Sequence, residues 1–184
     1  MPTLDTILEV ASRRLPSEGI PVLLVGGFAV NYYGFTRFTL DADFLIVAEH
    51  AAQVRRVVAD AGFINIITKE NMMRCSAPSC PLRADFLYTD AQTMHRLLPR
   101  AEEADIRGYA LKVPSLRDLL GMKIFALHQA PTARLPKDLA DIAWLGVLNA
   151  LDIEKDIRPL CTQFGSPALL DMIKAEMEKL SEEE

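Results

Sequence analysis

The spacing of apolar residues divides the chain into an N-terminal part with helices and strands and a C-terminal part with helices only. Apolar residues at three- and four-residue intervals predict helices, and short β-branched runs bounded by proline or glycine predict buried strands. The predicted strands are 21–25, 40–47, 63–68, 72–76, 83–88 and 110–113, and the predicted helices are 4–15, 28–33, 50–61, 91–98, 115–129 and 135–150, followed by helices beginning near residues 152 and 166. The pattern predicts an α+β fold, with a mixed β-sheet core flanked by helices over residues 1–113 and a C-terminal helical region packed on the core over residues 114–184.

Composition and charge narrow the classes of protein that the chain can belong to. Half of the 184 residues are hydrophobic and 24% are charged, so the chain can bury a core. The net charge of −5 argues against a globally basic nucleic-acid binder. The longest apolar run, 22–30, is too short to span a membrane, and no secretory signal precedes it. The odd set of three cysteines fits a reducing compartment, so we expect a cytoplasmic protein with no membrane partner.

The basic residues are not evenly spread. Between residues 107 and 137 six basic residues accompany one acid, whereas acidic residues predominate from residue 138 to residue 184. A cationic stretch in an acidic protein suits a small anionic ligand such as a nucleotide phosphate. The alternative is a solvated helix face.

Two acids open the second predicted strand. Side chains alternate along a strand, so Asp41 and Asp43 point to one face, ahead of the apolar run 44–47. Two carboxylates at the mouth of a core strand need compensation of their charge, and Mg²⁺, which prefers oxygen ligands, is a natural counter-ion. In the alternative interpretation Asp41 begins the strand from a turn and Asp43 pairs with Arg37.

A third acid, Asp85, lies in the middle of the apolar strand 83–88. If this strand lies beside the strand that carries Asp41 and Asp43, three carboxylates meet at one place. Three carboxylates with two divalent ions are suited to in-line phosphoryl or nucleotidyl transfer. The alternative is an edge-strand acid that faces water.

Charged residues of the C-terminal helices form a further candidate group. Lys123 falls on the leucine stripe of helix 115–129, so it must either extend to solvent or find an anion. Arg134, Lys137, Asp138 and Asp141 share one helix face, which taken alone is an exposed ion-pair ladder. In the N-terminal part, the glycine pair 26–27 after a strand makes a turn whose backbone N–H groups can approach a phosphate.

Taken together, these motifs resemble the DNA polymerase β-like nucleotidyltransferase superfamily, and within it the small bacterial AbiEii-type toxin nucleotidyltransferases and their relatives. The resemblance runs from about residue 21 to residue 148. It rests on Gly26-Gly27, the run Arg37-x-Thr39-x-Asp41-x-Asp43, Asp85, Lys123, and Lys137-Asp138-x-x-Asp141. Many members have Gly-Ser in place of Gly26-Gly27, so this chain lacks one hydroxyl contact to phosphate.

The resemblance implies a nucleotidyltransferase core that transfers a nucleoside monophosphate from an NTP to a hydroxyl of tRNA, a protein or a small molecule. It implies a two-ion Mg²⁺ site. The implied metal ligands are Asp41, Asp43 and Asp85, the catalytic residues are these three and Lys123, and the nucleotide-binding residues are Gly26, Gly27, Arg37, Lys123, Lys137 and Asp141. Three interpretations stay open: a toxin whose partner is an antitoxin or a second copy, an antibiotic-modifying enzyme, and an inactive binding or regulatory module. Duplex DNA is not an expected partner.

Overall fold

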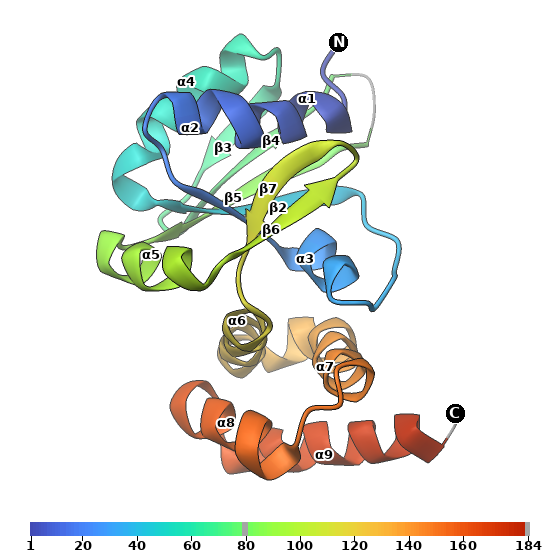
Figure 1. Ribbon diagram of the computed structural model, residues 1–184. Helices are drawn as coiled ribbons and strands as arrows, with labels where there is room; N and C mark the ends of the chain where they lie inside the picture. The colour runs from blue at the N-terminus through green and yellow to red at the C-terminus, as the bar shows by residue number, and fades with distance from the viewer. Residues whose placement is uncertain (79–80, 183–184) are drawn as a thin grey trace. The chain divides into compact units, whose positions relative to one another are not determined.

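The computed structural model describes residues 1–78 and 81–182, which form two compact units (Figure 1). The first unit contains residues 1–29 and 37–115, and the second contains residues 30–36 and 116–182. The predicted α+β class with a mixed sheet is confirmed. The division into separate domains at residues 113 and 114 stays a prediction, because compactness does not show that either part folds alone.

A five-stranded mixed sheet forms the centre of the first unit (Figure 1). Its strands, in spatial order, are β1 (Val22–Val25), β2 (Asp41–Val47), β5 (Arg83–Thr89), β4 (Met72–Ser76) and β3 (Ile64–Thr68). Strands β2 and β5 are parallel, whereas the other neighbouring pairs are antiparallel. Alternation buries Ala42, Phe44 and Phe86 on one face, where the rings of Phe44 and Phe86 stack at 5.2 Å. The other face is therefore left for the acids.

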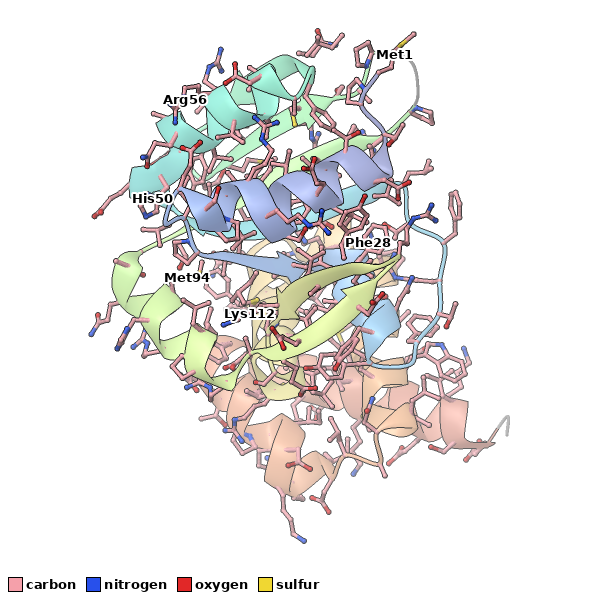
Figure 2. The ribbon with its side chains drawn as sticks, turned by 45° about the horizontal axis from the view of Figure 1, so that its top comes forward. Met1, Phe28, His50, Arg56, Met94 and Lys112 are labelled. Atoms are coloured by element: carbon pink, nitrogen blue, oxygen red, sulfur yellow. The ribbon has the colours of Figure 1, made fainter. Side chains whose placement is uncertain are left out.

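Helices complete the first unit. Helix α1 (Leu4–Glu9) continues through a π-helical turn (Val10–Arg14) into α2 (Leu15–Ser17), and the first part of α3 (Gly26–Tyr32) follows β1. A 3₁₀ turn (Ala48–His50) precedes α4 (Ala51–Asp60), and another (Leu98–Arg100) follows α5 (Ala91–Leu97). Helix α4 packs on β3 and β4 through its buried valines. Its outer surface carries Arg56, which pairs with Glu18 at 2.6 Å (Figure 2).

One hairpin strand was missed by the apolar pattern. Strands β6 (Glu102–Ile106) and β7 (Tyr109–Val113) form a two-stranded antiparallel sheet, and β7 lies beside β1. The connecting residues Arg107 and Gly108 both have positive φ, as a two-residue hairpin turn requires. Only β7 was predicted, because Glu-Glu-Ala-Asp-Ile carries too few apolar residues to indicate a strand.

The second unit is helical. It contains α6 (Leu116–Gln129), α7 (Pro131–Leu148), a π-helical turn (Ile153–Ile157), α8 (Arg158–Phe164) and α9 (Pro167–Glu182). Helix α6 packs against α7 and α8, and α7 packs against α9. Segment 30–36 joins this unit, since the ring of Phe35 stacks on Trp144 at 5.4 Å and Asn149 Nδ2 donates to the Tyr33 carbonyl at 3.0 Å.

Helix α7 begins four residues earlier than predicted and contains Pro136. Proline lacks an N–H and is most readily tolerated near a helix start. Pro136 lies in the second turn and costs a single backbone hydrogen bond there. Across the two described stretches of chain, no helix is long and apolar enough to cross a lipid bilayer.

Candidate active site

Three acids gather on one face of the central sheet. Asp43 on β2 and Asp85 on β5 are register partners in the parallel pair, and Asp41 lies two residues before Asp43 on the same face. Neighbouring strands are about 4.8 Å apart, so the carboxylates are close. Strand β5 is interior to the sheet and the Asp85 side chain is only 10% exposed, so it is not an edge-strand acid facing water. We call these three residues the carboxylate face.

Two arginines pair with the carboxylate face. Arg74 on β4 lies opposite Asp85 in register, and its Nε and Nη2 donate to the two carboxylate oxygens at 2.7 and 2.5 Å. Arg83 on β5 lies opposite Asp41 and donates to both of its oxygens at 3.0 Å. The sequence did not indicate Arg74, because the register of β4 against β5 cannot be read from the amino-acid sequence.

The two ion pairs differ in their exposure to water. The side chains of Arg83 and Asp41 are 49% and 31% exposed, whereas those of Arg74 and Asp85 are 40% and 10% exposed. The hydrogen bond to Asp85 raises the pKa of Arg74; burial opposes that rise, and the charges of Asp85, Asp41 and Asp43 add to it. The guanidinium of Arg74 is thus stabilised by the whole carboxylate face.

The carboxylate face fits Mg²⁺ by its donor chemistry. Three carboxylates on adjacent strands are the oxygen ligands that this ion prefers. Within residues 1–78 and 81–182, no three His, Cys, Asp or Glu side chains are arranged so that they could hold a metal ion. In the observed conformation Asp85 pairs with Arg74 and Asp41 pairs with Arg83.

The glycine turn packs directly against these acids. Gly26 has a φ of +63°, and a Cβ on this residue would lie 2.6 Å from Asp43 Cγ. A Cβ on Gly27 would lie 2.8 Å from Thr39 Oγ1 and 3.3 Å from Arg37 Nη1. The structure therefore brings the glycine pair together with the Arg37–Asp43 segment, and only glycine fits at residue 26.

A buried ionic cluster occupies the second unit. Lys123 Nζ on α6 donates to Asp138 Oδ1 at 3.0 Å and to Asp141 Oδ2 at 2.7 Å, both on α7, and Arg134 Nη1 donates to Asp138 Oδ2 at 3.1 Å. Lys123, Asp138 and Asp141 are buried, so Lys123 does not extend to solvent and the two acids do not belong to an exposed ladder. Lys137 is exposed. Asp138 is a cluster member that the sequence did not single out as a site residue.

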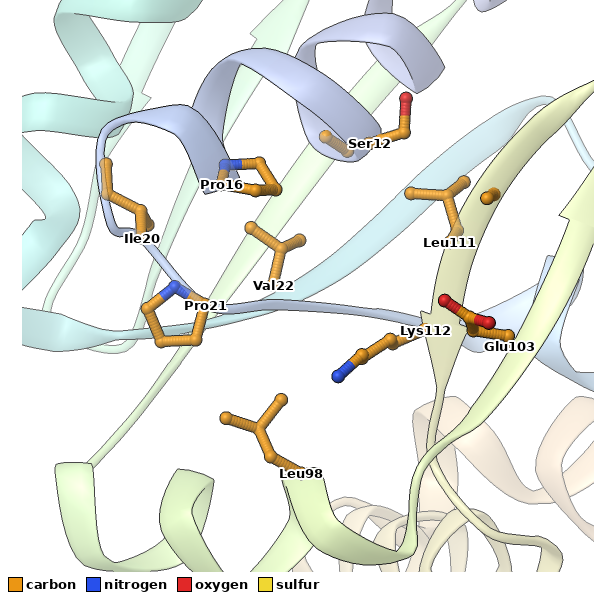
Figure 3. Close-up of a pocket in the computed structure, with 11 residues that line it drawn as sticks. Ser12, Pro16, Ile20, Pro21, Val22, Leu98, Glu103, Leu111 and Lys112 are labelled. Atoms are coloured by element: carbon orange, nitrogen blue, oxygen red, sulfur yellow. The ribbon is translucent and has the colours of Figure 1, made fainter.

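A cavity in the first unit lies away from the carboxylate face. It measures about 320 Å³ and is lined mainly by apolar side chains such as Pro16, Val22 and Leu98, together with Glu103 and Lys112, which are register partners on β6 and β7 (Figure 3). None of the predicted site residues lines it. The carboxylate face, and not this cavity, is the candidate active site.

Cys75 lies on β4, on the side of the sheet opposite the carboxylate face, and its thiol makes the stability of the folded state depend on alkaline pH. Burial raises the pKa of its thiol to about 12, and the charge of Asp85 adds to the rise. The folded state keeps this thiol neutral where an unfolded chain ionises it. Its contribution to stability is therefore complete below pH 9 and is lost as the pH rises toward 12.

We expect Cys75→Ala to flatten the alkaline loss of stability. Between pH 8 and pH 10 the free energy of unfolding of the variant should fall by about 1.4 kcal/mol less than that of the wild type. Urea denaturation at each pH measures the difference. An identical loss in both proteins would contradict the assignment. Burial raises the pKa of the Cys161 thiol to about 11. Cys161→Ala is therefore the matched comparison. At pH 10 it should reduce the alkaline loss of unfolding free energy by a similar amount.

Comparisons with known proteins agree on the fold. No protein-family model matches the chain, and no curated protein matches it in sequence. The antibiotic-resistance factor ANT(2'')-Ia is a structural neighbour with a TM-score of 0.57 and 14% identity, over 100% of this chain and 94% of the other. The lincosamide antibiotic adenylyltransferase LnuA, solved with lincomycin bound, has a TM-score of 0.56 and 14% identity over 79% of this chain and 98% of the other.

A third structural neighbour is similar over most of its length. An antigenic nucleotidyltransferase-like protein from Paracoccidioides brasiliensis has a TM-score of 0.55 and 18% identity over 94% of this chain and 92% of the other. At such identities the likeness is one of fold. The chain has a nucleotidyltransferase fold.

Proposed function

We propose that this protein is a Mg²⁺-dependent nucleotidyltransferase that moves a nucleoside monophosphate from an NTP to a hydroxyl acceptor. The observation that carries the proposal is the register of Asp43 with Asp85, with Asp41 on the same face of the sheet. The nucleotidyltransferase fold of the chain supports the same reaction class. NTPs are abundant in the cytoplasm, so we place the reaction there.

The proposed roles follow from residue chemistry. Asp41, Asp43 and Asp85 would hold Mg²⁺, which when bound neutralises charge on the triphosphate and lowers the pKa of the attacking hydroxyl. The turn at Gly26 and Gly27 lets backbone come close to the substrate phosphates. The guanidinium of Arg37 beside Gly27 supplies positive charge for the same phosphates.

Lys123, Lys137 and Asp141 complete the proposed nucleotide-binding set. The exposed amine of Lys137 is available to a phosphate. Lys123 and Asp141 already pair with each other, so we assign them the role of holding the α6–α7 pair that presents Lys137.

A small-molecule acceptor is the candidate that the neighbours favour. They include a complex of ANT(2'')-Ia with adenylyl-2''-tobramycin and a lincomycin-bound adenylyltransferase, and both proteins match this chain over nearly their whole length. The second candidate is an AbiEii-type toxin that modifies tRNA or a protein and is restrained by an antitoxin or a second copy. It rests on the motif order from Gly26 to Asp141.

Incubation with each α-labelled NTP, Mg²⁺ and a cell extract tests the reaction. We expect pyrophosphate release and label on an acceptor, whose size separates a small molecule from tRNA or protein. Asp43→Asn should lower the rate by roughly 1000-fold, because the charge stabilisation supplied by the metal is worth several kcal/mol. Asp60→Asn, an exposed acid in the same unit, is the matched control and should leave the rate unchanged. If no NTP binds or reacts, the chain is an inactive module with this fold.

A further inference from the structure

Arg74 and Arg83 lie on the carboxylate face, and the proposed reaction uses neither. Arg74 is the more confined of the two arginines, since it pairs with an acid that is only 10% exposed. Both oxygens of Asp85 accept a hydrogen bond from its guanidinium, at 2.7 and 2.5 Å. Its partner is the same carboxylate that the proposed metal site requires as its third ligand.

We propose that Arg74 is a built-in competitor of the divalent metal ion, so that the ion must displace its guanidinium before Asp85 can serve as a ligand. This inference rests on the proposed function, because that function supplies the metal site. Arg74 is a positioning residue in this scheme: it acts through Asp85 and does not touch the reacting atoms.

The physical basis is the chemistry of the shared carboxylate. An ionised aspartate only accepts hydrogen bonds, and a bidentate arginine engages both of its oxygens at once. The guanidinium also keeps its positive charge at any accessible pH, so it repels a cation that approaches the same carboxylate. The charges of Asp41 and Asp43 attract it as well, which holds it on the face.

Displacement of Arg74 is feasible because its side chain is not enclosed. The side chain is 40% exposed, and its stem is long and flexible enough for the charged head to turn toward water. The acid of the Arg83–Asp41 pair is more open to water than Asp85, so solvent and salt weaken this pair more. The two arginines therefore provide an internal comparison. Substitution of either one removes one positive charge, but only Arg74 pairs with a proposed metal ligand that is shielded from water.

Direct binding of Mn²⁺ to the full chain, followed by electron paramagnetic resonance of the free ion, tests the proposal without measuring activity. We expect Arg74→Gln to bind Mn²⁺ about tenfold more tightly than the wild type, because a charge-assisted bidentate pair no longer opposes the ion. Arg83→Gln should tighten binding by no more than about threefold. In an Asp85→Asn background, Arg74→Gln should change the affinity by less than about twofold, since the proposed effect passes through Asp85.

The outcomes separate this proposal from the proposed function. If the wild type binds Mn²⁺ through Asp43 but Arg74→Gln leaves the affinity unchanged or weakens it, Arg74 is no competitor and the nucleotidyltransferase assignment stands. An equal gain in Arg74→Gln with and without the Asp85→Asn change would also overturn it, because the effect would then be general electrostatics. If neither the wild type nor Arg74→Gln binds Mn²⁺, both proposals fail. Circular dichroism checks that each variant folds. If Arg74→Gln does not fold, Arg74→Lys replaces it, because lysine keeps the positive charge but loses the bidentate geometry. The affinity of Arg74→Lys for Mn²⁺ should be severalfold higher than that of the wild type.

Discussion

Replacing Lys123 with methionine should lower the free energy of unfolding by about 3–5 kcal/mol. Methionine matches the lysine stem in size but removes the ammonium that donates hydrogen bonds to Asp138 and Asp141 and balances their charge. Both acids are buried, and of the two cations in the cluster only Arg134, which pairs with Asp138, remains, so negative charge is left under-compensated between α6 and α7. Urea denaturation measures the effect.

Two further variants identify its source. Lys137→Met removes a lysine from the exposed surface of α7 and should change the free energy of unfolding by less than about 0.5 kcal/mol. The double variant Lys123→Met, Asp141→Asn should regain at least about 1 kcal/mol over Lys123→Met, because the buried charge of Asp141 is gone. A mild loss in Lys123→Met, similar to that of Lys137→Met, would show that the cluster is not structural and would return Lys123 to a role in phosphate binding.

Gly26→Ala should both destabilise the protein by about 3 kcal/mol and impair metal binding at the carboxylate face. A left-handed φ costs alanine about 1–2 kcal/mol, and the clash of the new methyl group with Asp43 adds a cost typical of overpacking. The carboxylate of Asp43 must move to make room. Since a displacement of about 1 Å at a reacting centre can cost 100-fold, the rate of nucleotidyl transfer should fall by at least that factor.

The chain supplies a matched control for this change. Gly19 has a φ of +74°, and a Cβ there would have no neighbour within 4 Å. Gly19→Ala should therefore show the backbone cost alone, about 1–2 kcal/mol, with unchanged Mn²⁺ affinity and transfer rate. Equal effects of the two substitutions on Mn²⁺ affinity would show that the turn does not position Asp43.

Local pattern was sufficient for most of the fold. The apolar runs that form β1, β2 and β5 are bounded by glycine, proline or acidic residues. The sequence was therefore sufficient to predict these strands and their approximate ends. Strand β6 was missed because its strand character comes from pairing with β7 and not from its own residues. Helix α7 was predicted to begin at residue 135, whereas it begins at Pro131 and contains Pro136 in its second turn.

The acids of the candidate site could be predicted, and their partners could not. Alternation places Asp41 and Asp43 on one face, but only the pairing of β2 with β5 brings Asp85 beside them. Arg74 stands opposite Asp85 because of the antiparallel register of β4, which depends on a connection whose length and shape the sequence does not fix. Helical periodicity put Lys123 on a buried stripe, yet it could not choose between a phosphate and the acids of the next helix as its anion.

The stacking of Phe35 on Trp144 gives the protein an intrinsic optical reporter. Trp144 is the only tryptophan in the chain, and both rings belong to the second unit. Fluorescence emission from this indole thus follows the melting of the helical unit, while far-ultraviolet circular dichroism follows both units together. A difference between the two melting curves would reveal that the units lose their structure in separate steps, without any label being attached.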